Sequence, residues 1–299
     1  PSVLVDKRAM RICIVTDEIS ADLETALELG TSWDVYDFEL RGFYTDRVPQ
    51  FSAYQKQRIR ELMEQFRARF VAISPGLFKF PYPPAERERF SLSAIDALLY
   101  NQWRDARNHV AYHLEELLPA SIDYAQELGT RQIVVFGFSR GGLPPGRAPD
   151  EVLETLRRAA EMAAGAGLRL AVEVEEGFWA DTGERAAAMV RAINHPALGI
   201  NWDPGNAIVA GDVPYPDGYE AAREYVRHVH FKDVVRKPRG RYQYAVAGDI
   251  DWKGQIRALA QDSFDGYIAV ETHMQPKVAS AKAALDRLRS LIAEAAVSP

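Results

Sequence analysis

The stretch Arg169–Trp202 reads RLAVEVEEGFWADTGERAAAMVRAINHPALGINW. It begins with the apolar run Arg169–Glu175 and ends with the apolar run Leu198–Trp202, and each has the length of a strand that is buried on both faces. Between them, Asp181 with a glutamate three residues on is typical of a capping box and predicts a helix over Arg185–Ile193. A strand, a helix and a second strand in this order predict parallel pairing with a crossover helix.

The same alternation of short apolar runs and longer amphipathic stretches extends along the whole chain. The eight apolar runs of strand length are Arg11–Thr16, Trp33–Leu40, Phe70–Ser74, Gln132–Phe138, Arg169–Glu175, Leu198–Trp202, His228–Lys232 and Tyr267–Glu271. The clearest predicted helices are Asp22–Leu29, which Ser20 caps and Gly30 ends, Asp150–Ala164, Arg185–Ile193 and Lys277–Ala295. Eight such units predict an α/β fold, a single (β/α)8 TIM barrel.

A doubly wound open sheet is the alternative architecture. A dinucleotide-binding sheet of that type carries a glycine-rich loop after its first strand. Here residues 16–20, TDEIS, stand in that place, which favours the barrel.

Composition places the chain among ordinary globular proteins. It has 299 residues, of which 47% are hydrophobic and 26% charged, and its net charge is −6. This acidic balance argues against a general nucleic-acid binder, and no apolar run has the length of a membrane span or a signal peptide. We therefore expect a cytoplasmic protein without nucleic-acid or membrane partners. A single cysteine, Cys13, excludes an intrachain disulfide.

One connection, between the third and fourth predicted strands, is much longer than the others. This insertion, residues 75–130, carries a proline-rich stretch and two predicted helices, near residues 94–113 and 115–128. Long insertions serve as lids, binding loops or oligomer contacts. A dimer or tetramer of this chain, in contact through the insertion, is therefore one alternative. No shift in composition marks a boundary. We treat residues 1–299 as one domain, with residues 1–10 as an N-terminal extension.

Side chains suited to metal binding stand at the ends of the last four predicted strands. Active sites of TIM barrels lie at the C-terminal ends of the strands, and there the chain places Glu173, Asp203, His230 and Glu271. Three carboxylates with one imidazole suit Mn²⁺, Mg²⁺, Co²⁺ or Zn²⁺, and a divalent cation would also relieve the repulsion between the carboxylates. Glu175 competes with Glu173, because residues two apart on a strand face the same way.

Seven short motifs, by their order and spacing, resemble the xylose isomerase-like TIM barrel superfamily of sugar isomerases and epimerases. They are TDEIS (16–20), FELR (38–41), SPGLFK (74–79), NWDPGN (201–206), VHFKDV (229–234), GDIDW (248–252) and AVETH (269–273). The resemblance covers nearly the whole chain from Arg11. It implies that Glu173, Asp203, His230 and Glu271 form the metal set, and Mn²⁺ is the metal expected first.

The resemblance implies a metal-dependent isomerase or epimerase that acts on a small keto sugar or sugar derivative. The metal would bind a carbonyl oxygen and a neighbouring hydroxyl and stabilise an enediolate, while Glu173 and Glu271 act as base and acid. Further substrate contacts are expected from Lys79, Glu175, Asn206, His228, Lys232 and Arg236. The last of these belongs to a basic cluster, residues 236–241, that is either a solvated loop or a clamp for an anion or hydroxyl.

Two alternative functions remain open. Elimination from the same enediolate would make the chain a lyase, such as a dehydratase of a keto-inositol, of a 3-keto sugar or glycoside, or of a dehydroshikimate-like compound, with Lys232 or Arg236 steadying the leaving oxygen. Asn206 stands where many epimerases place a histidine, and an amide cannot shuttle a proton, which argues against a ketose 3-epimerase. The other alternative is a non-catalytic barrel that binds a partner through the insertion 75–130.

Overall fold

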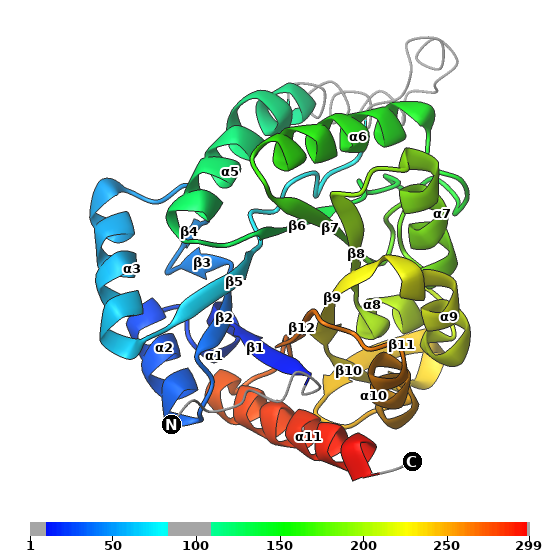
Figure 1. The fold of residues 1–299 in the computed structure, drawn as a ribbon. Helices are drawn as coiled ribbons and strands as arrows, with labels where there is room; N and C mark the ends of the chain where they lie inside the picture. The colour runs from blue at the N-terminus through cyan, green and yellow to red at the C-terminus, as the bar shows by residue number, and fades with distance from the viewer. Residues whose placement is uncertain (1–9, 83–108, 298–299) are drawn as a thin grey trace.

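A closed barrel of eight parallel strands stands at the centre of the molecule (Figure 1). The computed structural model describes residues 10–82 and 109–297. The barrel strands are β1 (Arg11–Val15), β2 (Asp37–Leu40), β5 (Arg69–Ile73), β6 (Gln132–Phe136), β7 (Arg169–Glu173), β8 (Leu198–Trp202), β9 (Val226–Phe231) and β12 (Tyr267–Val270). They pair in the order β1-β12-β9-β8-β7-β6-β5-β2, and β2 returns to β1. Each strand overlaps one of the eight predicted runs, so the TIM barrel is confirmed and the open sheet is wrong.

Helices surround the barrel and connect its strands (Figure 1). They are α1 (Thr16–Ile19), α2 (Leu23–Ser32), α3 (Ala53–Phe66), α5 (Leu118–Glu127), α6 (Asp150–Gly165), α7 (Gly183–Ile193), α8 (Pro204–Val209), α9 (Tyr219–Ala222), α10 (Trp252–Gln261) and α11 (Lys277–Val297). Short π- and 3₁₀-helical turns are η2 (His113–Leu117), η3 (Pro214–Gly218), η4 (Arg223–Tyr225) and η5 (Pro238–Gly240).

Helix α2 differs at both ends from the sequence prediction. Its cap is Asp22, whose side chain accepts the backbone N–H of Thr25 at 3.2 Å, and not Ser20. The helix also continues through Gly30, which we expected to end it. A Cβ at this glycine would lie 2.5 Å from the ring of Phe38. The glycine therefore allows α2 to pack closely on β2 and is not a stop signal.

Helix α7 also has a different cap from the one predicted. The side chain of Thr182 accepts the backbone N–H of Arg185 at 3.2 Å and so begins the helix at Gly183. Asp181, the predicted cap, instead pairs with the guanidinium groups of Arg140 and Arg185. The carboxylate of Asp181, which the sequence pattern assigned to capping, thus forms ion pairs with two arginines and does not cap the helix.

Two antiparallel hairpins lie outside the barrel. One joins β3 (Gly42–Phe43) to β4 (Asp46–Arg47), and the other joins β10 (Asp233–Lys237) to β11 (Arg241–Ala245). The second hairpin carries the basic cluster 236–241, which the sequence suggested to be a loop. Its strands pair residue by residue, so this cluster has an ordered backbone.

The long connection between β5 and β6 is described only in part. Its second predicted helix is confirmed as η2 followed by α5, whereas most of the first, near residues 94–113, and the extension 1–9 lie outside the described residues. His113 of η2 is buried, and its Nδ1 accepts the backbone N–H of Phe78 at 2.9 Å. Cys13 is fully buried inside the barrel. None of the helices within residues 10–82 and 109–297 could cross a membrane.

Candidate metal centre and substrate cavity

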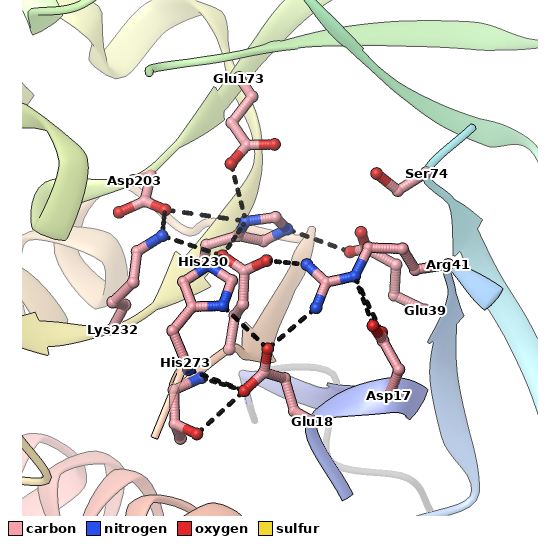
Figure 2. Close-up of polar contacts among 12 residues, drawn as sticks. Asp17, Glu18, Glu39, Arg41, Ser74, Glu173, Asp203, His230, Lys232 and His273 are labelled. Atoms are coloured by element: carbon pink, nitrogen blue, oxygen red, sulfur yellow. Dashed lines mark hydrogen bonds and ion pairs between the residues drawn. The ribbon is translucent and has the colours of Figure 1, made fainter. Parts of the chain in front are cut away.

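The four predicted metal ligands converge at the C-terminal mouth of the barrel. Glu173 is the last residue of β7, Asp203 and Glu271 directly follow β8 and β12, and His230 lies in β9. These strands are neighbours in the barrel, and one ligand atom from each side chain lies within 4.8 Å of the other three. Figure 2 shows Glu173 and Asp203 pointing toward His230 from adjacent strands.

The imidazole of His230 provides the test of whether this set fits a metal ion. Its Nδ1 lies 3.2 Å from Glu271, 3.5 Å from Glu173 and 3.8 Å from Asp203, measured to the nearest carboxylate oxygens. This nitrogen is buried and makes no hydrogen bond within the described structure. One nitrogen and three carboxylate oxygens around a common point are a donor set that suits Mn²⁺, Zn²⁺ or a related divalent cation. These four residues therefore fit a divalent metal ion.

A buried glutamate orients the imidazole. Oε2 of Glu39 lies 3.2 Å from Nε2 of His230 and 2.8 Å from Nε2 of His228. Because a carboxylate only accepts hydrogen bonds, Nε2 of His230 carries the proton and Nδ1 keeps its lone pair for a cation. Glu39 stands within FELR (38–41), but the motif alone does not reveal this role. Its position on β2, facing inward, is the signal that could have found it.

His228 does not contact the cavity, which corrects its predicted substrate-binding role. It lies one pleat below His230 and is only 2% exposed. Its partner is Glu39, so we assign His228 to the support of that carboxylate.

An arginine that sequence reasoning missed fixes Glu271. Nη1 of Arg41 lies 2.5 Å from Oε1 of Glu271, while its Nε and Nη2 bind Asp17 and Glu18 at 2.8 and 2.9 Å (Figure 2). The guanidinium therefore bridges three carboxylates from the ends of β1 and β12. Arg41 follows β2 in the FELR motif, but sequence gives no sign of which carboxylates it meets.

Glu271 is surrounded by positive charge. Besides Arg41, its Oε2 lies 3.0 Å from Nζ of Lys232, 3.2 Å from His230 and 3.4 Å from Nε2 of His273. Burial acts to raise the pKa of Glu271, but the interactions with its neighbours, led by the charge of Lys232, outweigh it and hold the pKa well below its usual range. Glu271 is thus a permanent anion and a weak proton acceptor.

Lys232 is buried between two of the metal-set carboxylates. Its Nζ lies 2.7 Å from Oδ2 of Asp203 and 3.0 Å from Oε2 of Glu271. Burial would lower the pKa of Lys232, yet these two carboxylates and Glu173 raise it well above its usual value. Burial raises the pKa of Asp203. The ammonium therefore stays charged beside the metal set.

Glu18 ties the first strand of the barrel to the last. Its Oε2 accepts the backbone N–H groups of Thr272 and His273 at 3.0 and 2.8 Å, and the Thr272 hydroxyl at 3.0 Å. Burial would raise the pKa of Glu18, but the hydrogen bond from His273 outweighs it and lowers the pKa to about 2. This ionised carboxylate positions the residues that follow Glu271.

A cavity of about 150 Å³ opens beside the metal set, comparable to cavities that hold a single six-membered ring. Its lining residues are Arg41, Arg47, Ser74, Lys79, Phe136, Glu173, Glu175, Asn206, Lys232, Tyr244, Glu271 and His273. The cavity thus gathers the predicted substrate contacts Lys79, Glu175, Asn206 and Lys232.

Glu175 takes a place in the cavity wall and not in the metal set. Its Oε2 lies 3.2 Å from Nζ of Lys79. Burial, with the nearby charge of Glu173, raises the pKa of Glu175 to about 6. A carboxyl group with this pKa is partly protonated near neutral pH, so it can donate a proton.

Asn206 lines the cavity, but its amide is already engaged. Its Nδ2 donates to the carbonyl of Val174 at 3.0 Å. Its backbone N–H donates to Oδ1 of Asp203 at 2.9 Å, so the metal-set carboxylate also caps α8.

Arg236 is not among the residues that line the cavity in the described part of the chain. Its exposed guanidinium donates to the hydroxyl of Tyr242 at 3.1 Å. In the β10–β11 hairpin, Arg236 pairs with Tyr242, whereas Val234 pairs with the cavity residue Tyr244. Arg236 is therefore displaced by two residues, roughly 7 Å, toward the tip of the hairpin.

The sequence profile described as xylose isomerase-like TIM barrel matches residues 30–291. The chain belongs to this family. It is 28% identical over 147 residues to an inosose dehydratase of Lactiplantibacillus plantarum, covering 44% of this chain and 49% of that protein. It is 26% identical over 172 residues to a ketose 3-epimerase of Arthrobacter globiformis, covering 55% of this chain and 57% of that protein.

This chain of the xylose isomerase-like family thus spans about half the length of the curated relatives it matches. Among solved structures, a xylose isomerase-like TIM barrel protein of Mycobacterium smegmatis in complex with magnesium has a TM-score of 0.66 and 15% identity. That match covers 96% of this chain and 97% of the other. At this identity the likeness supports the fold alone.

Proposed function

We propose that this chain is a divalent-metal-dependent lyase that acts on a small polyhydroxylated ketone. It would remove the proton beside the carbonyl and release water from the next carbon. The observation that carries the proposal is an asymmetry between two cavity carboxylates. Glu271 is engaged by three cationic side chains, Arg41, Lys232 and His273, whereas Glu173 contacts only the imidazole of His230 among the described residues, at 3.5 Å. Glu173 is available as a base, while Glu271 is held as an anion by its partners. This arrangement suits a reaction in which a proton is removed from one face of the substrate and is not returned to the other.

The metal would be held by the four residues that meet at the mouth of the barrel. Glu173, Asp203, His230 and Glu271 offer one nitrogen and three carboxylate groups, and we expect Mn²⁺ first, with Mg²⁺, Co²⁺ and Zn²⁺ as alternatives. Bound there, the ion would polarise the substrate carbonyl and acidify the adjacent C–H bond.

The protein side chains would then handle the protons. Glu173 takes the proton from the carbon beside the carbonyl, because its one ionic contact among the described residues is made by Oε1, to His230, which leaves Oε2 for the substrate. Glu175, two residues on in the cavity wall, gives a proton to the departing hydroxyl as the carbon–oxygen bond breaks and a double bond forms. Lys79 holds Glu175 in place through its 3.2 Å contact.

Isomerisation or epimerisation is the second candidate. Glu271 lines the same cavity as Glu173, so two carboxylates face the substrate, as a proton transfer between two faces requires. A ketose 3-epimerase is among the similar proteins. The three cationic partners of Glu271 and the amide at position 206 weigh against this candidate.

The products formed in heavy water separate the two candidates. The chain, loaded with Mn²⁺, is incubated in D₂O with a keto-inositol or with ketoses, and the products are analysed by mass spectrometry and ultraviolet absorbance. A lyase gives an unsaturated product that has lost water. An epimerase or isomerase gives a saturated product that carries deuterium, and that result would refute the lyase.

Matched variants assign the proton donor. Glu175→Gln should lower turnover strongly and leave Mn²⁺ affinity near that of the parent chain. Glu176→Gln, at the exposed neighbouring position, is the control and should change little. Full turnover in Glu175→Gln would remove this residue from the mechanism.

A further inference from the structure

We propose that Arg47 binds a carboxylate group at the end of the substrate that is remote from the ketone, so that the preferred substrate is a keto sugar acid. This inference rests on the proposed function, because it concerns the same cavity. It identifies a substrate class and a residue that selects it.

Arg47 stands apart from the other cationic groups that line the cavity. Arg41 binds Glu271, Lys79 binds Glu175, Lys232 binds Glu271 and His273 binds Glu271, at distances of 2.5 to 3.4 Å. Within the described residues no carboxylate lies within ion-pair distance of Arg47. Burial, together with the neighbouring charge of Arg41, lowers the pKa of Arg47, as expected for a cation without a counter-charge.

The backbone of the third barrel strand's end holds the guanidinium in a fixed plane. Nε of Arg47 donates to the carbonyl of Ser74 at 2.9 Å, and Nη2 lies 3.4 Å from the Ser74 hydroxyl. Gly76 makes room for the group: its φ is +79°, and a Cβ there would lie 3.2 Å from Cζ of Arg47. Nη1 has no hydrogen-bond partner among the described residues, so a fixed donor remains for a ligand.

The position of Arg47 sets where its ligand lies. Ser74 directly follows β5, which is four places from β9 in the ring of eight strands and is therefore diametrically opposite it. His230 and Lys232 come from β9 and its end. Figure 2 shows Ser74 across from Asp203 and Lys232, with His230 between them. A substrate whose carbonyl lies at the metal set thus extends its other end toward Arg47.

Charge and size favour a carboxylate over a phosphate. Arg47 supplies one positive charge that no carboxylate of residues 10–82 and 109–297 compensates, which matches a carboxylate, whereas a phosphate monoester carries about −1.5 to −2 at neutral pH. A planar guanidinium also matches the two oxygens of a carboxylate. The cavity of about 150 Å³ has room for one six-membered ring or an equivalent open chain.

Binding of matched acid and neutral sugars tests the proposal without turnover. The pairs are D-fructuronate with D-fructose and D-glucuronate with D-glucose, whose members differ by a carboxylate in place of a hydroxymethyl group. Affinities for the Mn²⁺-loaded chain are measured by competition calorimetry or ligand-observed NMR. We expect each acid to bind about tenfold more tightly than its neutral partner, the usual value of a charge-assisted contact.

Variants locate the source of the preference. Arg47→Gln should remove the preference, so that each acid binds about as tightly as its neutral partner, and Arg47→Lys should keep part of it. Arg157→Gln, on the outer surface of α6, is the matched control and should keep all of it. Equal affinity within both pairs, absence of binding by all four sugars, or a preference that survives in Arg47→Gln would overturn the assignment. Absence of turnover with retained acid preference would instead refute only the proposed reaction.

Discussion

Replacement of Glu39 by glutamine tests how the metal centre is built. Glu39 is 1% exposed, and its Oε2 accepts from both His228 at 2.8 Å and His230 at 3.2 Å. Glutamine keeps the shape and one acceptor oxygen but loses the negative charge. The imidazole of His230 would then lose the partner that keeps its Nε2 protonated and its Nδ1 aimed at the metal set.

The expected loss is about tenfold to hundredfold in Mn²⁺ affinity, which corresponds to roughly 1.4 to 2.7 kcal/mol, the range found when the hydrogen-bond partner of a metal-binding histidine is removed. Isothermal titration of the metal-free chain with Mn²⁺ measures it directly. Urea unfolding measured alongside shows whether the variant still folds, because removal of one partner from a buried ion pair is itself destabilising.

Asp37→Asn is the matched control. Asp37 begins the same strand and pairs with Arg69 at 2.7 Å, at the opposite end of the barrel from the metal set. This variant makes the same chemical change and should leave Mn²⁺ affinity unaltered. An unchanged affinity in a folded Glu39→Gln variant, or an equal loss in both variants, would refute the orienting role of Glu39.

Three further predictions concern metal binding, pH and packing. Asp203→Asn should abolish Mn²⁺ binding in calorimetry while keeping the fold, because an amide can still cap α8; retained affinity would contradict the metal assignment. Burial lowers the pKa of His113 from 6.5 to about 4, so between these values the unfolded chain binds a proton that the folded chain excludes. The free energy of unfolding should therefore fall by up to about 3 kcal/mol from this group as the pH drops through that range, and urea titrations of His113→Asn should show a flatter dependence; an unaltered slope would argue against it. A Cβ at Gly183 would lie 1.9 Å from the backbone oxygen of Gly218, so Gly183→Ala should cost roughly 1–3 kcal/mol in urea unfolding, whereas Gly165→Ala, with nothing within 4 Å of the new atom, should not destabilise; similar midpoints for the two would speak against the clash.

Hydrophobic pattern was sufficient to predict the barrel, because strands buried on both faces leave continuous apolar runs. The run Leu198–Trp202 is predicted and observed with the same bounds. The convergence of Glu173, Asp203, His230 and Glu271 was also predictable, since parallel strands bring their C-terminal ends to one rim.

Contacts between side chains that are remote in sequence could not be predicted. Arg41 could have paired with any carboxylate on the rim, and only the closed barrel shows that it bridges Asp17, Glu18 and Glu271. Arg236 follows the strand of His230 by only a few residues, which predicts a place at the cavity. The β10–β11 hairpin instead carries Arg236 away from the cavity, toward the tip of the hairpin. The predicted cap of α7 was wrong for a similar reason, because Asp181 pairs with Arg140 and Arg185.

The hydrogen bonds of Glu18 have a consequence for the order in which the molecule is made. They join residues 254 positions apart, and the Arg41–Glu271 pair joins residues 230 positions apart. During synthesis, neither contact can form before residues 271 and 272 have left the ribosome. A nascent chain can pair Arg41 with Asp17 and Glu18 early, but the contacts of Arg41 and Glu18 with residues 271–273 form late, as expected for contacts of such separation. We expect metal capture to be the last event of biogenesis, possible only for a barrel that has closed.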